Sequence, residues 1–310
     1  QKVAVHVRAG KDNLEGTLQL NAPKGWVVSS PQLFTLERQG ETSTLWFTVT
    51  PPKNQSQGYL RPLIQIGDTY YDKELINIDY DHIPYQSVLL PSKAKVVRIN
   101  IEKKGQHIGY IQGAGDGVGQ SLEQIGYSVT NLDVTEISAQ SLKKYDAVVV
   151  GVRAYNTITA LAFAQNELNK YVQAGGTMVV QYNTSHRLVT KQVAPYALSL
   201  SRDRVTDEFA KVTILDPNHP VLNSPNKITQ VDFKGWVQER GLYFPNKWAE
   251  EFTPILAMND KGAPQTKGSL LVARYGKGHY VYTGLSFFRE LPAGVAGAYR
   301  LFANIISIGK

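Results

Sequence analysis

The sequence predicts a β-sandwich over residues 1–90, followed by an α/β domain with a parallel sheet over residues 91–310. Residues 1–90 consist of short alternating apolar runs with no helical period. After about residue 95, apolar strand-like runs alternate with helical patterns. Residues 83–93, with Pro84 and Pro91, separate the two regions, and we predict a stiff linker there because proline fixes φ.

The strands expected in the first domain are short and are separated by glycine, proline and asparagine. They cover residues 3–8, 16–20, 44–50, 63–66 and 74–78. Strands at this spacing, with turn residues between them, are typical of a sandwich.

In the second domain, strands are expected at residues 107–112, 127–132, 146–151 and 177–181, with helices at 118–125, 141–144 and 159–173. This alternation predicts parallel strands joined by right-handed crossovers, and such sheets bind ligands at the carboxyl ends of their strands. The remainder predicts strands at 210–215, 230–233, 254–258, 269–274 and 279–283, a hairpin turn at 275–278 and a helix at 294–306.

Composition argues against several classes of function. The net charge is +7, but no basic run exceeds two residues, so we expect no nucleic-acid partner. No apolar run approaches the ~20 residues of a membrane-spanning helix. The absence of cysteine excludes disulfides, thiolate metal sites and thiol catalysis. The six histidines are scattered, so we expect no metal site and no cofactor. Because the chain begins at Gln1 without an initiator methionine or signal peptide, we expect a mature or excised part of a longer product.

The glycine-rich segment 113–119 lies between a predicted strand and a predicted helix. Such glycines can let backbone N–H groups approach an anion at a helix N-terminus. The spacing is not the G-x-G-x-x-G of dinucleotide-binding proteins, however. We therefore favour a tight turn that requires positive φ, with Asp116 facing the mouth of a pocket.

The segment 151–157 follows the third predicted parallel strand and places Arg153, Tyr155 and Asn156 at its carboxyl end. A guanidinium group there could bind a carboxylate ligand. Alternatively, Arg153 could pair with Glu239 or Glu290 in a buried network. Both interpretations stay open, and we expect the buried network.

Gln181 and Asn183 occupy the turn after the fourth parallel strand. Amides donate and accept hydrogen bonds but do not act as nucleophiles. Ser185 and His186 are adjacent in sequence, which does not make a catalytic triad, because triad members must meet in space and need an orienting acid.

Two further segments, 235–244 and 287–292, are rich in aromatic and charged residues. Their aromatic faces could line a carbohydrate groove. They could equally cover the end of the sheet with an internal Arg–Glu network, which we favour. The candidate residues in them are Trp236, Glu239, Arg240, Arg289 and Glu290.

Several motifs carry a resemblance to a known family. GYIQGAGD at 109–116, VRAYNT at 152–157, QYN at 181–183, WVQERGLY at 236–243 and FRELPAG at 288–294 resemble the C-terminal region of long PIG-L (LmbE-like) deacetylases of Bacteroidetes. PKGW at 23–26 and FTVTPP at 47–52 resemble the Ig-like (NPCBM-associated) domain found beside glycosidase and carbohydrate-binding modules.

The resemblance implies an Ig-like sandwich followed by a flavodoxin-like domain of the class I glutamine amidotransferase or ThuA-like type. It also implies export to the periplasm or the outside of a bacterial cell, and a zinc-dependent N-acetyl-sugar deacetylase domain upstream. The zinc motif of that domain has no counterpart here, so no metal ligands are carried over. Amidotransferases carry their nucleophilic cysteine at the turn that follows residue 181, and this chain has none.

Three functions remain open. The chain could be a non-catalytic accessory region that positions the deacetylase domain or binds its glycan. It could be a carbohydrate-active hydrolase, which would need two facing carboxylates ~5–10 Å apart among Asp116, Glu239 and Glu290. It could also be a protein-interaction scaffold. The expected partners are a glycan and the upstream deacetylase domain.

Overall fold

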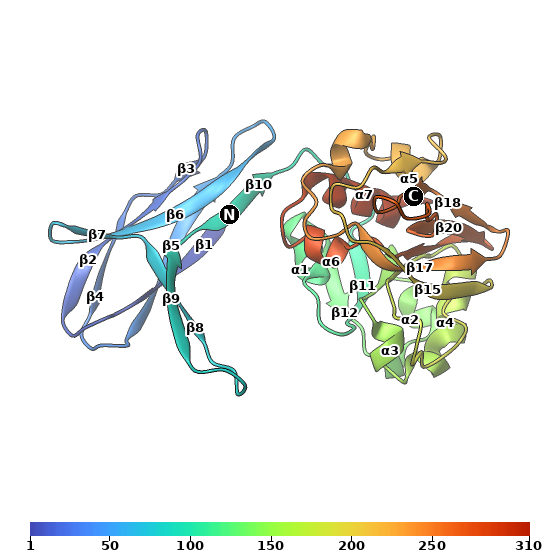
Figure 1. Cartoon of the computed structure of the whole chain (residues 1–310), viewed down its shortest axis with the longest axis horizontal. Helices are drawn as coiled ribbons and strands as arrows, with labels where there is room; N and C mark the ends of the chain where they lie inside the picture. The colour runs from blue at the N-terminus through green and yellow to red at the C-terminus, as the bar shows by residue number, and fades with distance from the viewer. The chain divides into compact units, whose positions relative to one another are not determined.

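The computed structural model describes residues 1–310 and divides them into two compact units, Gln1–Asn100 and Ile101–Lys310 (Figure 1). The division therefore lies at residue 100, where the sequence pattern placed it at residue 90. Residues 91–100 belong to the first unit because Ala94–Arg98 pairs with Ser56–Ile66.

The first unit consists of β-strands without a helix. Its strands are β1 (Lys2–Arg8), β2 (Leu14–Asn21), β3 (Val27–Val28), β4 (Gln32–Leu36), β5 (Thr42–Thr50), β6 (Ser56–Ile66), β7 (Thr69–Tyr71), β8 (Lys73–Ile78), β9 (Gln86–Pro91) and β10 (Ala94–Arg98).

Two antiparallel sheets, β1-β5-β3 and β10-β6-β2-β4, share the apolar core of this unit. Alternation within β2 and β5 sends every second side chain inward, as the sequence pattern predicted for two-faced strands. Phe47 from one sheet and Leu18, Leu36 and Leu60 from the other are almost completely buried in this core. The more specific Ig-like assignment stays a prediction.

The segment 83–93, predicted as a linker, instead contains β9, which pairs with β8 over six residue pairs from Lys73–Pro91 to Ile78–Gln86. Pro91 did not prevent this because it is the last residue of its strand, where proline is tolerated.

The second unit combines helices and strands. Its helices are α1 (Val118–Gln124), α2 (Ala139–Leu142), α3 (Ala154–Thr157), α4 (Leu161–Gln173), α5 (Pro220–Asn223), α6 (Phe287–Glu290) and α7 (Ala296–Ser307), with 3₁₀ turns η1 (Val134–Glu136) and η2 (Gln230–Phe233). Its strands are β11 (His107–Ile111), β12 (Ser128–Asn131), β13 (Ala147–Val150), β14 (Thr177–Gln181), β15 (Leu198–Val205), β16 (Thr213–Ile214), β17 (Gly241–Trp248), β18 (Phe252–Pro254), β19 (Leu256–Ala257), β20 (Leu270–Tyr275) and β21 (Gly278–Thr283).

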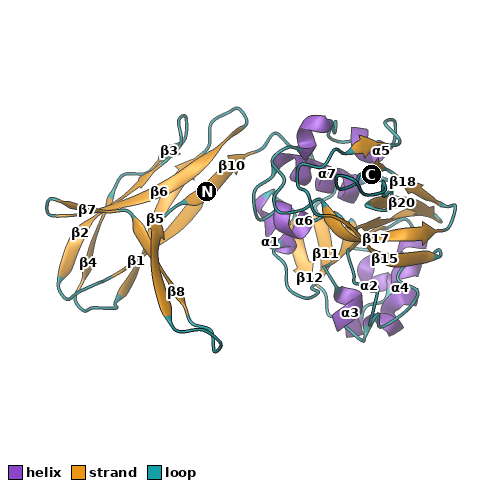
Figure 2. Ribbon diagram, viewed as in Figure 1, coloured by secondary structure: helices purple, strands orange, loops and turns teal.

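Seven of these strands form one sheet in the order β12-β11-β13-β14-β21-β20-β18. The first five are parallel, and in chain order they read 2-1-3-4-5, which is the flavodoxin-like arrangement. Helices lie on both faces of this sheet (Figure 2). The strands are therefore buried on both sides, which explains the continuous apolar run of β13.

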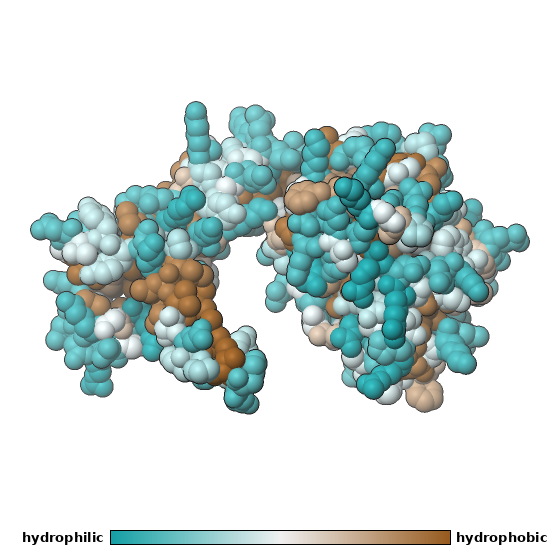
Figure 3. Space-filling view, in the orientation of Figure 1, coloured by the Kyte–Doolittle hydropathy of each residue, from teal (hydrophilic) through white to brown (hydrophobic).

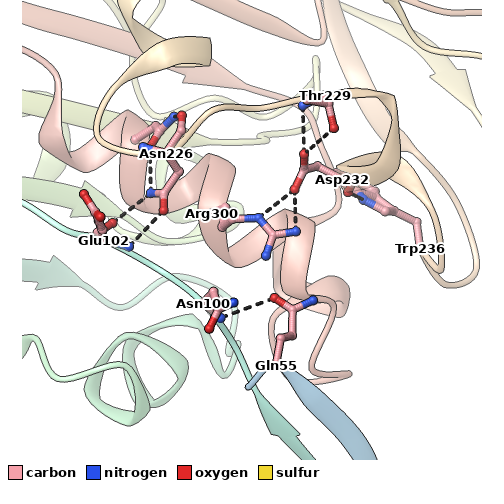
Figure 4. Close-up of polar contacts among 9 residues, drawn as sticks. Gln55, Asn100, Glu102, Asn226, Thr229, Asp232, Trp236 and Arg300 are labelled. Atoms are coloured by element: carbon pink, nitrogen blue, oxygen red, sulfur yellow. Dashed lines mark hydrogen bonds and ion pairs between the residues drawn. The ribbon is translucent and has the colours of Figure 1, made fainter. Parts of the chain in front are cut away.

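One expected strand, residues 230–233, is the 3₁₀ turn η2 instead. Val231 and Phe233 gave it an alternating pattern, but local hydrogen bonding prevails. The Asp232 carboxylate accepts from the Thr229 backbone N–H at 2.8 Å and forms an ion pair with Arg300 of α7 (Figure 4). Such a side-chain cap satisfies the free N–H groups at the start of a helical turn.

The expected strand over residues 210–215 is reduced to the two residues of β16, and the pair β15–β17 had no counterpart in the sequence prediction. No helix of the structure is both long and apolar enough to cross a membrane.

Candidate functional site

The carboxyl ends of β11, β13, β14 and β21 meet at one edge of the sheet. In the 2-1-3-4-5 order the crossover direction reverses between β11 and β13, and flavodoxin-like proteins bind ligands in the crevice at that point. The loops that follow these strands therefore form the candidate site.

The crevice between β11 and β13 is closed by hydrogen bonds between the two loops. The Asp116 carboxylate accepts from the backbone N–H groups of Val152, at 3.2 Å, and Val118, at 3.0 Å. It also accepts from the Tyr110 hydroxyl. In addition, the Ala114 N–H donates to the Val152 carbonyl at 2.8 Å. Asp116 thus lies at the strand ends as predicted, but its oxygens hold the loops together.

The glycines of this loop serve the turn itself. A Cβ on Gly113 would lie 2.1 Å from the carbonyl oxygen of Val152, and Gly115 has a φ of +93°. A side chain at the first position would force the two loops apart, and one at the second would strain the backbone. These contacts favour the tight-turn interpretation over an anion-binding loop.

The turn after β14, where an amidotransferase carries its nucleophile, is buried. Gln181 is 1% exposed, and its Nε2 donates to the Tyr110 hydroxyl at 3.4 Å. The Asn183 side chain is 0% exposed; its Oδ1 accepts from the Tyr155 N–H at 2.9 Å, and its Nδ2 donates to the Gln181 carbonyl. The Asn183 amide therefore fixes the turn, whereas the Gln181 amide contacts β11 and leaves its buried Oε1 without a hydrogen-bond partner.

Two further predicted site residues are structural as well. The Tyr155 side chain is fully buried, and its hydroxyl donates to Gln165 Oε1 at 2.6 Å within the core beneath α4. The Asn156 side chain bridges to the next loop by donating to the Thr184 carbonyl and accepting from the Thr184 N–H. The prediction that these two side chains face a ligand pocket is therefore corrected.

Trp236 and Arg240 are also core residues rather than groove residues. Trp236 is 3% exposed, packs against Phe233 and Phe287, and donates its indole N–H to the Asp232 carbonyl at 3.0 Å. Arg240 is 4% exposed and donates to the Ala210 carbonyl from Nε and Nη2.

Glu239 forms the Arg–Glu pair expected at this edge. Its Oε1 lies 2.9 Å from Nε of Arg289, whose Nη1 also donates to Gln238 Oε1. The arginine side chain is about one third exposed and the glutamate side chain 11% exposed. The pair therefore lies at the border between core and solvent. Arg153 takes no part in this ion pair.

Glu290 is fully buried and has no arginine in direct contact. Its two carboxylate oxygens accept from the Val237 N–H at 3.2 and 2.9 Å, and the Ser286 hydroxyl lies 3.3 Å from one of them. Burial raises the pKa of this carboxyl to about 7, against the opposing effect of these hydrogen bonds and of the charges on Arg240 and Arg289.

The edge also carries an aromatic–arginine cluster of Tyr182, Tyr243, Phe288, Arg153 and Arg204, in which Tyr182 is buried, Tyr243 and Phe288 are partly exposed and the two arginines are exposed. The rings of Tyr182 and Tyr243 stack with centroids 6.0 Å apart and 8° between their planes, and Phe288 lies 5.2 Å from Tyr182. The guanidinium of Arg204 lies 5.7 Å from the Tyr243 ring. Arg153 and Arg204 are exposed and form no ion pair.

Tyr182 lies among the charged groups of this edge. Burial raises the pKa of its hydroxyl, and the positive charges of Arg153 and Arg289 act against that effect, whereas Glu239 adds to it. The backbone N–H of Arg153 also donates to the Tyr182 carbonyl at 2.8 Å. The loops after β13, β14 and β21 therefore meet around this one phenol.

Backbone strain concentrates at the same place. Arg153, Gln238 and Tyr243 adopt left-handed φ values of 57°, 72° and 53°. Residues other than glycine rarely adopt this conformation, which costs of the order of 1–3 kcal/mol each and often accompanies function. Three of the four such residues in the second unit therefore belong to this edge; the fourth is Arg187.

Sequence reasoning named Arg153 but not the four other members of the cluster. Tyr182 lay within the turn after the fourth parallel strand, and Tyr243 and Phe288 lay within the two aromatic-rich segments. One signal could have identified these three aromatic residues: each lies next to polar residues in a segment close to a strand end. Arg204 carried no signal, because β15 was not expected. No group of three or more His, Asp or Glu residues lies close enough to hold a metal ion.

Comparison with known proteins gives a likeness of fold only. No family model matches the sequence, and no curated protein sequence matches it. Among solved structures, the chain is similar to a putative GMP synthase protein from Thermoplasma acidophilum, with 11% identity, a TM-score of 0.43 and coverage of 66% of this chain and 96% of that one.

Two further solved structures show a likeness of the same order. A putative ThuA-like protein from Bacteroides uniformis has 14% identity and a TM-score of 0.41, covering 64% of this chain and 88% of its own. PurLQS from Thermotoga maritima has 12% identity and a TM-score of 0.42, covering 67% and 100%. At these values, the flavodoxin-like description rests on the strand order of the sheet itself.

Proposed function

We propose that this chain is a non-catalytic accessory region of an exported carbohydrate deacetylase and that it binds glycan at the aromatic–arginine cluster. The observation that carries the proposal is the placement of two unpaired, exposed arginines, Arg153 and Arg204, in a cluster whose partly exposed rings are those of Tyr243 and Phe288. The upstream deacetylase domain is the proposed partner within the same protein, and the periplasm or cell exterior the proposed location.

The chemistry of the cluster suits a sugar that carries negative charge. Aromatic side chains present apolar faces against which the C–H groups of a sugar ring can pack. The planar guanidinium group donates two parallel hydrogen bonds to a carboxylate, and it can do the same for a sulfate. Because Glu239 already occupies Arg289, the guanidinium groups left for a ligand are those of Arg153 and Arg204.

The three carboxylates considered for a hydrolase are all engaged by protein groups. Asp116 accepts three hydrogen bonds from its own and the neighbouring loop, and Glu239 pairs with Arg289. Glu290 has the raised pKa of a general acid, but its side chain is fully buried and out of reach of a substrate. These contacts favour binding over hydrolysis.

The proposal is tested by measuring binding calorimetrically to a panel of neutral and uronate-containing oligosaccharides. We expect the acidic members to bind, and Arg204→Ala and Phe288→Ala each to weaken binding at least tenfold, which corresponds to about 1.4 kcal/mol. Arg274→Ala is the matched control, because Arg274 is also exposed but lies opposite His279 in the β20–β21 ladder, at the amino end of β21. Binding that is insensitive to both cluster variants would refute the site, and binding to no glycan would favour the protein-interaction scaffold.

A further inference from the structure

The hairpin β8–β9 is an arm that pairs with no other strand. The two strands form a sheet of their own, and no other element makes more than marginal contact with them. Every residue of β9 is exposed, and in β8 only Ile78 is partly buried. In Figure 1 the arm extends away from the other strands of the first unit.

Both faces of this arm carry large aliphatic side chains. Residues directly opposite in an antiparallel pair share a face, so Ile76 and Val88 lie on one face and Leu75 and Leu89 on the other. Leu75 is 54% exposed and Leu89 is 64% exposed. Figure 3 shows the arm as a continuous hydrophobic stripe on the surface.

An isolated two-stranded arm of this kind lacks the further strands that would stabilise it. A two-stranded hairpin is at best marginally stable in water, and three or more strands are normally needed for a stable sheet. Contiguous exposed apolar surface marks interaction sites. An exposed strand edge is in addition a template for pairing with another strand. We propose that the β8 edge pairs antiparallel with β8 of a second copy of this chain, forming a four-stranded sheet β9-β8-β8-β9 about a two-fold axis.

The charges of β8 select one register for this pairing. A two-fold axis through Ile76 places Ile76 opposite itself and Lys73 opposite Asp79 of the second copy, so two ion pairs form at the ends of the interface. An axis through Asn77 would instead place Asp79 opposite Leu75. An axis through Leu75 would place Lys73 opposite Asn77 and Glu74 opposite Ile76, so neither charge would face an opposite charge. The register through Ile76 also places Leu75 opposite Asn77 and Glu74 opposite Ile78, but it is the only one of the three that places Ile76 opposite itself and Lys73 opposite Asp79.

Lys73 is available for this role. Its only acid in the chain is the adjacent Asp72, 3.8 Å away, and both side chains are more than half exposed. An exposed ion pair of this kind contributes little stability. Lys73 can therefore leave Asp72 and pair with Asp79 of the second copy at little cost in free energy. Asp79 follows directly after the last residue of β8 and is itself exposed.

A cysteine placed on the two-fold axis tests the register, because the chain contains no cysteine of its own. Directly opposite residues of an antiparallel pair have Cα atoms ~4.5–5.5 Å apart, within disulfide reach. We expect Ile76→Cys to form disulfide-linked dimers under mild oxidation at least ~10 times faster than Leu89→Cys, which would lie three strands, about 14 Å, from its own copy. A mixture of Leu75→Cys and Asn77→Cys chains should also cross-link, because these positions face each other.

Charge exchange provides an independent measurement on the cysteine-free chain. Sedimentation should show a dimer that is weakened by Lys73→Asp and by Asp79→Lys, and restored by the double exchange. Lys53→Asp, on an exposed turn of the same unit, is the matched control. A chain that sediments as a monomer at all concentrations, or Ile76→Cys and Leu89→Cys cross-linking at equal rates, would overturn the proposal. A double exchange no better than its single variants would likewise overturn the register.

Discussion

Glu239 and Arg289 form the ion pair at the carboxyl edge of the sheet, with 2.9 Å between Oε1 and Nε. The sequence left open whether Arg153 makes that pair, and we expected a buried network that includes it. The structure gives Arg153 an exposed side chain without an ion-pair partner. The Arg153 backbone N–H, in contrast, donates a hydrogen bond to the Tyr182 carbonyl. An Arg–Glu pair therefore exists at this edge, but Arg289 rather than Arg153 forms it, and the pair is only partly buried.

Arg153→Ala should consequently leave the thermal melt nearly unchanged while it weakens glycan binding. An exposed arginine without a partner contributes little to stability, usually within about 0.5 kcal/mol. Differential scanning fluorimetry together with calorimetric binding measures both effects. A melt that falls by many degrees would show that the side chain has a structural role after all. Because residue 153 has a left-handed φ, Arg153→Asn is a useful second variant, since asparagine tolerates this conformation.

Arg289→Ala is expected to behave in the opposite way. It removes the partner of Glu239, whose side chain is only 11% exposed, and leaves a mostly buried carboxylate without its counter-charge. We expect the melting temperature to fall by several degrees, and Arg289→Ala combined with Glu239→Gln to recover part of that loss, because the double variant buries no charge. An equal fall in the single and double variants would show that the pair itself adds no stability.

Asp116→Ala should destabilise the second unit. The carboxylate accepts from two backbone N–H groups and one hydroxyl, and it connects the loop after β11 to the loop after β13. Losing hydrogen bonds to a charged acceptor costs roughly 2–4 kcal/mol in total. Urea unfolding of Asp116→Ala and Asp116→Asn measures this, with a smaller loss expected for the amide, which retains one acceptor oxygen. No loss in either variant would contradict the structural role given to this residue.

The parallel sheet could be predicted from the sequence for a physical reason. Strands covered on both faces need continuous apolar runs, and β13 and β14 consist entirely of buried residues. The segments at the edges of the domain could not be predicted in this way. β15 carries charged residues along an irregular pairing with β17, and η2 has the alternation of a strand although Asp232 caps it as a turn. In these segments tertiary contacts outweigh the local pattern.

The candidate site was predictable in position but not in composition. Strand ends follow from the βα alternation, so Asp116, Arg153 and Gln181 were correctly placed at one edge of the sheet. Whether a polar side chain faces a ligand or its own backbone depends on burial, which a single sequence does not reveal. Gln181 and Trp236, both almost fully buried, show how residue types suited to binding can serve packing instead.

The turn after β14 also carries a prediction about catalysis. A glutaminase of this fold needs a thiolate nucleophile, and the chain has no cysteine. We expect the purified chain to release no ammonia from glutamine above the uncatalysed rate in a coupled glutamate dehydrogenase assay. Release that is abolished by substituting a residue of the cluster, such as Arg153→Ala, would contradict this expectation.

Glu290 should make the stability of the second unit depend on pH. Burial raises the pKa of its carboxyl from the ordinary value of 4.5 to about 7, so between these values the folded chain holds a proton that the unfolded chain has released. Unfolding then releases a proton, and the free energy of unfolding decreases as the pH rises from 4.5 to 7. Above pH 7 both states are ionised and this contribution no longer changes.

The measurement compares the melting temperature of the native chain with that of Glu290→Gln at pH 5 and at pH 8. Glutamine keeps an acceptor for the Val237 N–H but does not titrate, so subtracting the two melts removes the pH dependence of all other groups. We expect the native chain to lose several degrees relative to Glu290→Gln between pH 5 and pH 8. A difference that is the same at both pH values would show that Glu290 ionises in the folded chain as readily as in the unfolded one. A difference that changes with the opposite sign would place the folded pKa below 4.5, which would require Arg240 or Arg289 to outweigh the burial of the carboxyl.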